Sequence, residues 1–195
     1  MSTVAKYHSC DYAPRYDNME EGPQQRVKIL KDLRGLLDKI DSSKVTLIGD
    51  IMLDRYYHGY SNRLISTAPV PVLKIQRSEE SPGAAAHIAR GLGSLGLDVS
   101  IFSCVGDDRE GEVIKQQFLS DGLSIDGIET VLDRQTLTKI RFFGSRQSLL
   151  EKSQILLQAD RESLDELDVK VSNRLVDNTL ESIPDSCALV ISDYD

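Results

Sequence analysis

Apolar residues recur along this chain with two periods, one typical of amphipathic helices and one typical of buried strands. The helical period predicts helices over residues 24–40, 84–95, 111–119 and 163–183. Short apolar runs predict strands over residues 44–49, 99–105, 137–143, 154–158 and 188–192. Strands that alternate with helices are typical of a parallel sheet with right-handed crossovers. The pattern therefore predicts an α/β fold.

Two segments lack either period. Residues 1–24 are polar and contain Pro14 and Pro23, which predicts a flexible N-terminal arm. Residues 55–81 mix tyrosine, valine and isoleucine with glycine and proline. Because proline cannot donate a hydrogen bond within a sheet, this segment predicts irregular or edge strands.

Composition narrows the class of partner. The 195 residues are 40% hydrophobic and 28% charged, which is typical of a globular protein with a buried core. A net charge of -8 argues against a nucleic-acid or anionic-membrane partner, because both require a basic surface. No stretch is apolar enough to span a membrane or form a signal core. We therefore expect a cytoplasmic protein with a small-molecule partner.

One glycine pattern is a formal match to a dinucleotide-binding fingerprint. The stretch 91–96 reads Gly-Leu-Gly-Ser-Leu-Gly, but a predicted helix precedes it and a predicted strand follows it, the reverse of the order required. We interpret its small residues as close helix packing, with Gly96 ending the helix. The sequence also has no Gly-x-x-x-x-Gly-Lys-Ser/Thr phosphate loop.

Candidate ligand groups follow two predicted strands. Asp50 and Asp54 come directly after the first strand, where carboxylates can accept hydrogen bonds from sugar hydroxyls. The structural alternative is that one of them caps a turn or pairs with Arg55. Asp193 follows the last strand, at the sheet edge where open α/β sheets place ligand groups.

Two further groups have both a binding and a structural interpretation. Gly83 and Ala84 precede a helix whose first turn contains His87, so backbone amides there can approach a ligand closely. The alternative is a simple helix entry. Lys139 and Arg141 project to the same face of a strand, where they can pair with a phosphate or lie on a solvated face.

Four stretches, at 49–75, 81–108, 137–150 and 189–195, carry a family resemblance. They read GDIMLDRYYHGYSNRLISTAPVPVLKI, SPGAAAHIARGLGSLGLDVSIFSCVGDD, LTKIRFFGSRQSLL and LVISDYD. Together they resemble the ribokinase-like (PfkB) carbohydrate kinases, specifically the D-glycero-D-manno-heptose 7-phosphate kinase domain of ADP-heptose synthases. The resemblance implies a ribokinase-like domain over 25–195, incomplete at its C-terminus, with a small β-sheet lid from about 55–81 and 137–158.

The resemblance also implies roles for the candidate residues. Asp54 would hold sugar hydroxyls, and the lid would serve as a homodimer interface. Asp50 and Asp193 are additional substrate-binding candidates. The residues placed under the sugar or near its phosphate are Gly83, Ala84, His87, Lys139 and Arg141. Ala84 stands where the family usually has a second glycine, His87 where it has asparagine, and Thr67 where heptose kinases tend to have glutamate.

Family members use ATP and Mg²⁺, and their catalytic aspartate lies in a Gly-Ala-Gly-Asp-like helix start. No such motif occurs in these 195 residues, so no catalytic residue is assigned. We therefore expect the sugar-binding half of an ATP-dependent carbohydrate kinase, inactive as an isolated chain. The alternative is a non-catalytic sugar-phosphate-binding or dimerising pseudokinase.

Overall fold

The computed structural model describes residues 23–37, 43–145, 153–163 and 165–194. The chain forms two compact units, residues 1–39 and 40–195. The first contains α1 (Pro23–Leu37), which confirms the predicted helix as far as residue 37. Pro23 is its first residue, a position that tolerates the missing amide hydrogen. The predicted arm otherwise lies outside the described residues.

The second unit contains a four-stranded parallel core sheet. Its strands are β1 (Lys44–Gly49), β4 (Asp98–Gly106), β5 (Ile128–Val131) and β8 (Ala188–Ser192). They lie in the order β5-β4-β1-β8, and every pair is parallel. The α/β fold and the parallel sheet predicted from the apolar pattern are confirmed.

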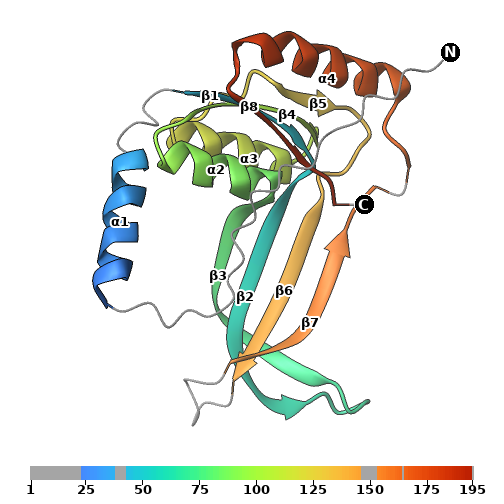
Figure 1. Ribbon diagram of the computed structural model, residues 1–195. Coiled ribbons are helices and arrows are strands. Elements are labelled where there is room, and N and C mark those ends of the chain that lie inside the picture. The colour runs from blue at the N-terminus through green and yellow to red at the C-terminus, as the bar shows by residue number, and fades with distance from the viewer. Residues whose placement is uncertain (1–22, 38–42, 146–152, 164, 195) are drawn as a thin grey trace, which may run out of the picture. The chain divides into compact units, whose positions relative to one another are not determined.

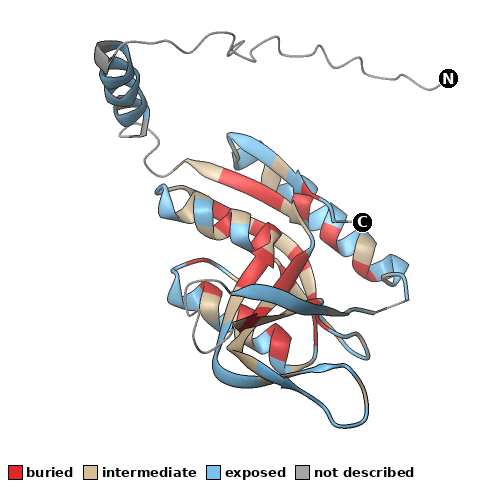
Figure 2. Ribbon diagram, turned by 90° about the horizontal axis from the view of Figure 1, so that it is seen from below, coloured by how far each residue is buried: buried red, intermediate tan, exposed pale blue. Residues whose placement is uncertain are grey.

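Helices cover both faces of the core sheet (Figure 1). On one face lie α2 (Ala85–Ser94) and α3 (Arg109–Ser120), and on the other lies α4 (Val169–Ser182), which continues into a short 3-10 turn (Ile183–Asp185). Successive side chains of β1 point to opposite faces of the core sheet. Leu47 packs into the apolar core with α2 and α3, whereas the Thr46 hydroxyl contacts the Ser182 and Ser186 hydroxyls at 2.9 and 2.7 Å. Figure 2 shows the buried residues gathered between the sheet and its helices.

A second sheet, here called the lid, is built from β2 (Ile51–Leu64), β3 (Pro71–Ala84), β6 (Thr138–Ser145) and β7 (Gln154–Arg161). Its order is β3-β2-β6-β7, with β2 and β6 parallel and the outer pairs antiparallel. Aromatic rings of β2 and β6 stack across the pair: Tyr57 on Phe142 at 5.2 Å and His58 on Phe143 at 5.0 Å between centroids. Such cross-strand pairs stabilise the interior of the lid.

The lid corrects one expectation. Residues 55–81 were expected to form irregular or edge strands, yet β2 is a continuous 14-residue strand in the interior of the sheet. The prolines explain the error, because Pro71 and Pro82 both lie in β3, which is indeed an edge strand. Irregularity in β2 is confined to register shifts at 58/59 and between Tyr60 and Arg63.

Two local signals determine how the helices begin and end. Gly96, with φ +88°, follows α2, and Gly93 faces Leu123 so closely that a β-carbon would lie 2.8 Å from its Cδ2 atom. The structural interpretation is thus confirmed for Gly93 and Gly96, whereas a β-carbon at Gly91 would meet nothing within 4 Å, so Gly91 makes no close packing contact. The fourth predicted helix begins at Val169 instead of residue 163, because Asp168 accepts a hydrogen bond from the Lys170 amide and caps it.

Candidate functional site

Asp54 and Arg141 meet across the β2–β6 pair. Their strands run parallel with Asp54 opposite Lys139 and Tyr56 opposite Arg141. One guanidinium nitrogen of Arg141, Nη1, donates to Asp54 Oδ1 at 2.6 Å and to the Tyr56 hydroxyl at 3.3 Å. Arg141 Nε donates to Gln158 Oε1 at 3.2 Å. Asp54 therefore pairs with Arg141, and not with its neighbour in sequence.

The environment of Arg141 favours a permanent positive charge. Burial alone would lower the pKa of Arg141, but the hydrogen bond and the negative charge of Asp54, with smaller contributions from Tyr56 and Asp160, raise it. The Arg141 guanidinium also lies 5.5 Å from the centroid of the Tyr56 ring. Side by side, the Arg141 guanidinium can bind an anion while the Asp54 carboxylate accepts a hydrogen bond from a hydroxyl.

Gly83 allows Asp54 to lie where it does. Gly83 is paired with Met52 on β2, and a β-carbon at Gly83 would collide with Asp54 Oδ2. The Asp54 carboxylate thus lies directly against the glycine backbone, just before α2 begins. Sequence reasoning proposed both residues for one site, and the structure brings them together.

Ala84 has a backbone conformation that favours glycine. Its φ of 54° and ψ of -128° lie in the region that L side chains rarely adopt. Ala84 occupies the N-cap position of α2, and its side chain makes no capping hydrogen bond. The site therefore carries backbone strain at a position where the resemblance implies a second glycine.

His87 points elsewhere. It is exposed on α2 and lines a cavity of about 420 Å³ with Arg90, Gly91 and Asp121 among its neighbours. No hydrogen bond or ion pair between His87 and Asp54 or Arg141 is present among the described contacts. His87 is therefore not a direct partner of Asp54 or Arg141 among the described contacts.

A second group of candidates gathers where β1, β8 and β6 converge. The Tyr194 amide donates to Asp50 Oδ2 at 3.1 Å, and Lys139 Nζ lies 6.0 Å from the centroid of the Tyr194 ring. Asp193 precedes Tyr194 and is exposed. Asp50 and Lys139 are therefore linked through a residue that sequence reasoning did not single out.

A protein-family model described as "pfkB family carbohydrate kinase" matches residues 42–178, more than half of the chain. The chain belongs to the pfkB family. The "Bifunctional protein HldE" of Hyphomonas neptunium is 36% identical over 163 residues, which cover 83% of this chain and 32% of that protein. This pfkB-family chain therefore spans about a third of the length of that relative. The resemblance to PfkB carbohydrate kinases is confirmed, and the curated relatives that the chain matches include HldE proteins.

Solved structures confirm the ribokinase-like fold. The crystal structure of a putative sugar kinase from Clostridium perfringens superposes with a TM-score of 0.56 and 13% sequence identity. The superposition covers 76% of this chain and 43% of the Clostridium chain. Arabidopsis thaliana ribokinase, complexed with ribose and ATP, matches 77% of this chain and 45% of its own, with a TM-score of 0.53 and 14% identity.

Two residues of the candidate site were missed by sequence reasoning. Tyr56 and Gln158 flank the Arg141 guanidinium from the strands on either side. The alternation of side chains along a strand places Tyr56 on the same face as Asp54, so the signal for Tyr56 was present in the sequence. Gln158 comes from β7, whose register with β6 is set only in the folded sheet.

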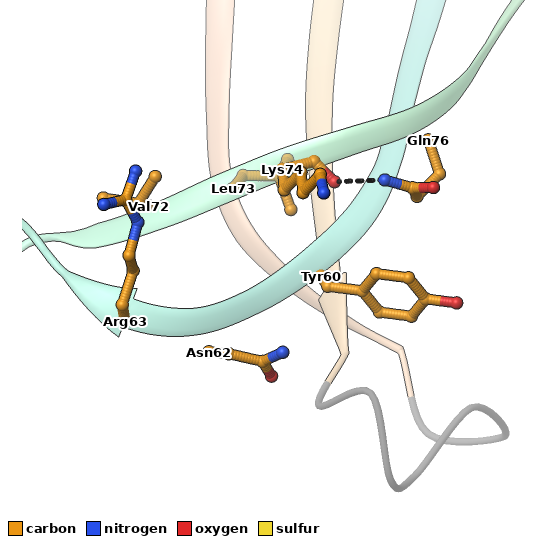
Figure 3. Close-up of a pocket in the computed structure, with 7 residues that line it drawn as sticks. All are labelled: Tyr60, Asn62, Arg63, Val72, Leu73, Lys74 and Gln76. Carbon is orange, nitrogen blue, oxygen red and sulfur yellow. Dashed lines mark hydrogen bonds between the residues drawn. The ribbon is translucent and has the colours of Figure 1, made fainter.

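A cavity of about 750 Å³ is lined by residues of β2 and β3 near the turn that joins these strands (Figure 3), further along β2 than Asp54. It is lined by Tyr60, Asn62, Arg63, Val72, Leu73, Lys74 and Gln76. None of these side chains is a carboxylate, and the hydrogen bond drawn there joins Gln76 to the Lys74 carbonyl. We therefore place the candidate site of this pfkB-family chain at Asp54, not at the larger cavity.

Within the described part of the chain, no three histidine, cysteine or acidic side chains lie close enough to hold a metal ion. The described residues also include no helix that is long and apolar enough to cross a membrane.

Proposed function

We propose that this chain is the sugar-binding half of an ATP-dependent carbohydrate kinase whose acceptor is a sugar or sugar phosphate resembling heptose 7-phosphate. The observation that carries the proposal is the Asp54 carboxylate, held by Arg141 at 2.6 Å and lying against Gly83, in a chain of the pfkB family. A carboxylate suits sugar hydroxyls, and a guanidinium suits a phosphate.

Each candidate residue has a part in this proposal. Asp54 accepts hydrogen bonds from sugar hydroxyls, with Gly83 and Ala84 providing the backbone surface beneath. Arg141 and Lys139 bind the phosphate of the acceptor. Asp50, His87 and Asp193 are further candidates, which a ligand would reach from the neighbouring strand and helix ends.

ATP and Mg²⁺ belong to the proposal as cofactors of the parent reaction. The Arabidopsis ribokinase of the same fold was solved with ATP. When bound, the metal nucleotide supplies the phosphoryl group. We assign none of the described residues to the metal, since they offer no cluster that fits it.

We propose that residues 1–195 assayed alone do not transfer a phosphoryl group. Such transfer depends on positioning and charge stabilisation, and these residues contain no Gly-x-Gly-Asp helix start. A coupled assay of ADP release with heptose 7-phosphate, ribose and fructose is expected to give no signal above the protein-free rate. Turnover that is abolished by Asp54→Asn would contradict this inactivity.

The second candidate function is a non-catalytic pseudokinase that binds a sugar phosphate. The strained backbone at Ala84 and the outward placement of His87 favour it. A chimera in which residues 43–194 replace the matching segment of an HldE kinase domain separates the two functions. ADP release with heptose 7-phosphate supports the kinase half, whereas binding without release supports the pseudokinase. The Asp54→Asn chimera is the control for background release.

We also propose that two copies associate through their lids and that the protein acts in the cytoplasm. Exposed apolar side chains on the lid, among them Ile75 and Leu157, support the association. Light scattering coupled to size exclusion should give twice the monomer mass, and Leu157→Glu should shift it to the monomer. A wild-type monomer would contradict the association.

A further inference from the structure

A second cluster of charges lies on the face of the lid opposite to Asp54. Successive residues of a strand point to opposite faces, so Arg55 points away from the sugar site. Arg55 is buried, and its Nε donates to Glu80 Oε1 at 2.7 Å while its Nη2 donates to Glu110 Oε1 at 3.0 Å. Glu80 lies directly opposite on β3, and Glu110 lies in the first turn of α3. Arg55 therefore joins two lid strands to a helix of the core sheet.

The other edge of the lid reaches the same helix turn. Arg161 is the last residue of β7, and its Nη2 lies 3.4 Å from both Glu110 Oε2 and Asp108 Oδ2. Asp108 caps α3 and also accepts hydrogen bonds from the amide and hydroxyl of Thr136, two residues before β6. The start of α3 is thus bonded to Arg55 of β2, to Arg161 of β7 and to Thr136 just before β6, and β3 joins through the Arg55–Glu80 pair. We call this cluster the junction, and its members are Arg55, Glu80, Asp108, Glu110 and Arg161.

The junction favours one arrangement of the lid. Glu110 and Arg55 are only 6% and 9% exposed. If the lid moved and broke this ion pair, each residue would be left with a buried charge that water could not solvate. A guanidinium can bond two carboxylates at once in a fixed plane, which an ammonium cannot do. The positive end of the α3 dipole also stabilises the carboxylates of Asp108 and Glu110, which lie at the start of that helix.

We propose that Arg55 is a positioning residue for the sugar site. By holding β2 and β3 against the first turn of α3, it sets the angle of the lid to the core sheet. That angle sets where Asp54 and Arg141, which the lid carries, lie relative to Asp50 and Tyr194 at the end of the core sheet. The part of this proposal that concerns ligand affinity rests on the proposed function.

Hydrogen–deuterium exchange of the full 195-residue chain tests the proposal. Arg55→Met keeps the aliphatic part of the side chain and removes the guanidinium group. The amides of β2, β3 and β7 should therefore exchange at least ten-fold faster, whereas those of β1 and β4 should exchange at the wild-type rate. Arg55→Lys should give an intermediate rate. Arg77→Met is the matched control, because it removes an exposed arginine–glutamate pair on β3 and should change neither sheet.

Equal acceleration in both sheets, or none in the lid, would overturn the proposal. If Arg55→Met does not fold, Glu110→Gln, which keeps the shape and removes one charge, is measured in the same way.

Affinity for heptose 7-phosphate gives a readout that a merely structural role would not move. Arg55→Met should weaken binding at least ten-fold, Arg55→Lys should restore part of it, and Arg77→Met should bind as the wild type does. A loosened lid with unchanged affinity would overturn the positioning role. If the wild type does not bind heptose 7-phosphate, the proposed function fails, and the exchange rates still decide whether Arg55 holds the lid.

Discussion

Among the described residues, Ala84 has the backbone conformation least suited to a side chain. A non-glycine residue at φ 54° and ψ -128° costs about 1 kcal/mol relative to glycine. Ala84→Gly should therefore raise the free energy of unfolding by about 1 kcal/mol and Tm by roughly 2–4 °C. Thermal unfolding followed by circular dichroism measures the shift. Ala86→Gly, at a buried helical position of α2, is the control and should lower Tm; a lower Tm for Ala84→Gly would contradict the strain.

Gly83 and Gly91 form a matched pair for testing the place of Asp54. A β-carbon at Gly83 would displace the Asp54 carboxylate, whereas one at Gly91 meets nothing within 4 Å. Gly83→Ala should weaken binding of heptose 7-phosphate at least ten-fold. Gly91→Ala should leave binding unchanged and stabilise α2 by about 0.5–1 kcal/mol. Calorimetric titration and thermal unfolding give both readouts, and equal affinities of the two variants would refute the assignment.

The candidate site could be predicted from the sequence only in part. Asp54 and Gly83 were found because each adjoins a recognisable element and belongs to a family motif. The Asp54–Arg141 ion pair joins residues 87 positions apart, so it depends on the register of β2 with β6. The exposure of His87 likewise depends on how α2 is rotated against the sheet, which its apolar period alone does not fix.

At the scale of elements, α3 depends on a charged cap. Asp108 Oδ1 accepts from the Gly111 amide, and its other contacts are with Thr136 and Arg161. Burial alone would raise the pKa of Asp108, but the hydrogen bonds from Thr136 and Gly111 and the charge of Arg161 lower it below its ordinary value. The ionised Asp108 carboxylate therefore stabilises the folded state fully above the ordinary aspartate pKa of about 4. This stabilisation is lost as pH falls through the lowered pKa that Asp108 has in the folded state.

Asp108→Asn removes this pH-dependent stabilisation. At pH 7 the variant should be less stable than the wild type by about 1 kcal/mol, and the difference should shrink as pH falls below about 4. Urea unfolding at a series of pH values measures it, with the exposed neighbour changed by Asp107→Asn as the control. A difference that grows toward acid pH would contradict the lowered pKa.

Local signals predicted most elements, and tertiary pairing decided the rest. The strand and helices around residues 84–119 were predicted within two residues at each end, because their apolar periods and the Asp108 cap are local. The four-residue β5 was not predicted, since a run so short gains its stability from pairing with β4. The interior place of β2, in a segment expected to form irregular or edge strands, has the same origin: its pairing with β3 and β6 outweighs the glycine within it.

At the scale of the whole second unit, the lid has two faces with different roles. One face carries Asp54 and Arg141, and the other carries Arg55 in the junction with α3. Asp54 and Arg55 are neighbours on β2 and point to opposite faces of the lid. A change in the position of the lid would therefore also change the geometry of the candidate site at Asp54. The fold is shared with ribokinases, and the proposed chemistry depends on this coupled site.

Calorimetric titration of the 195-residue chain with heptose 7-phosphate tests the central claim most directly. We expect saturable binding by the wild type, and at least ten-fold weaker binding by Asp54→Asn and by Arg141→Met. Arg174→Met, which removes an exposed ion pair with Glu129, should bind as the wild type does. Absence of wild-type binding, or binding that Asp54→Asn and Arg141→Met leave unchanged, would contradict a sugar-phosphate site at Asp54.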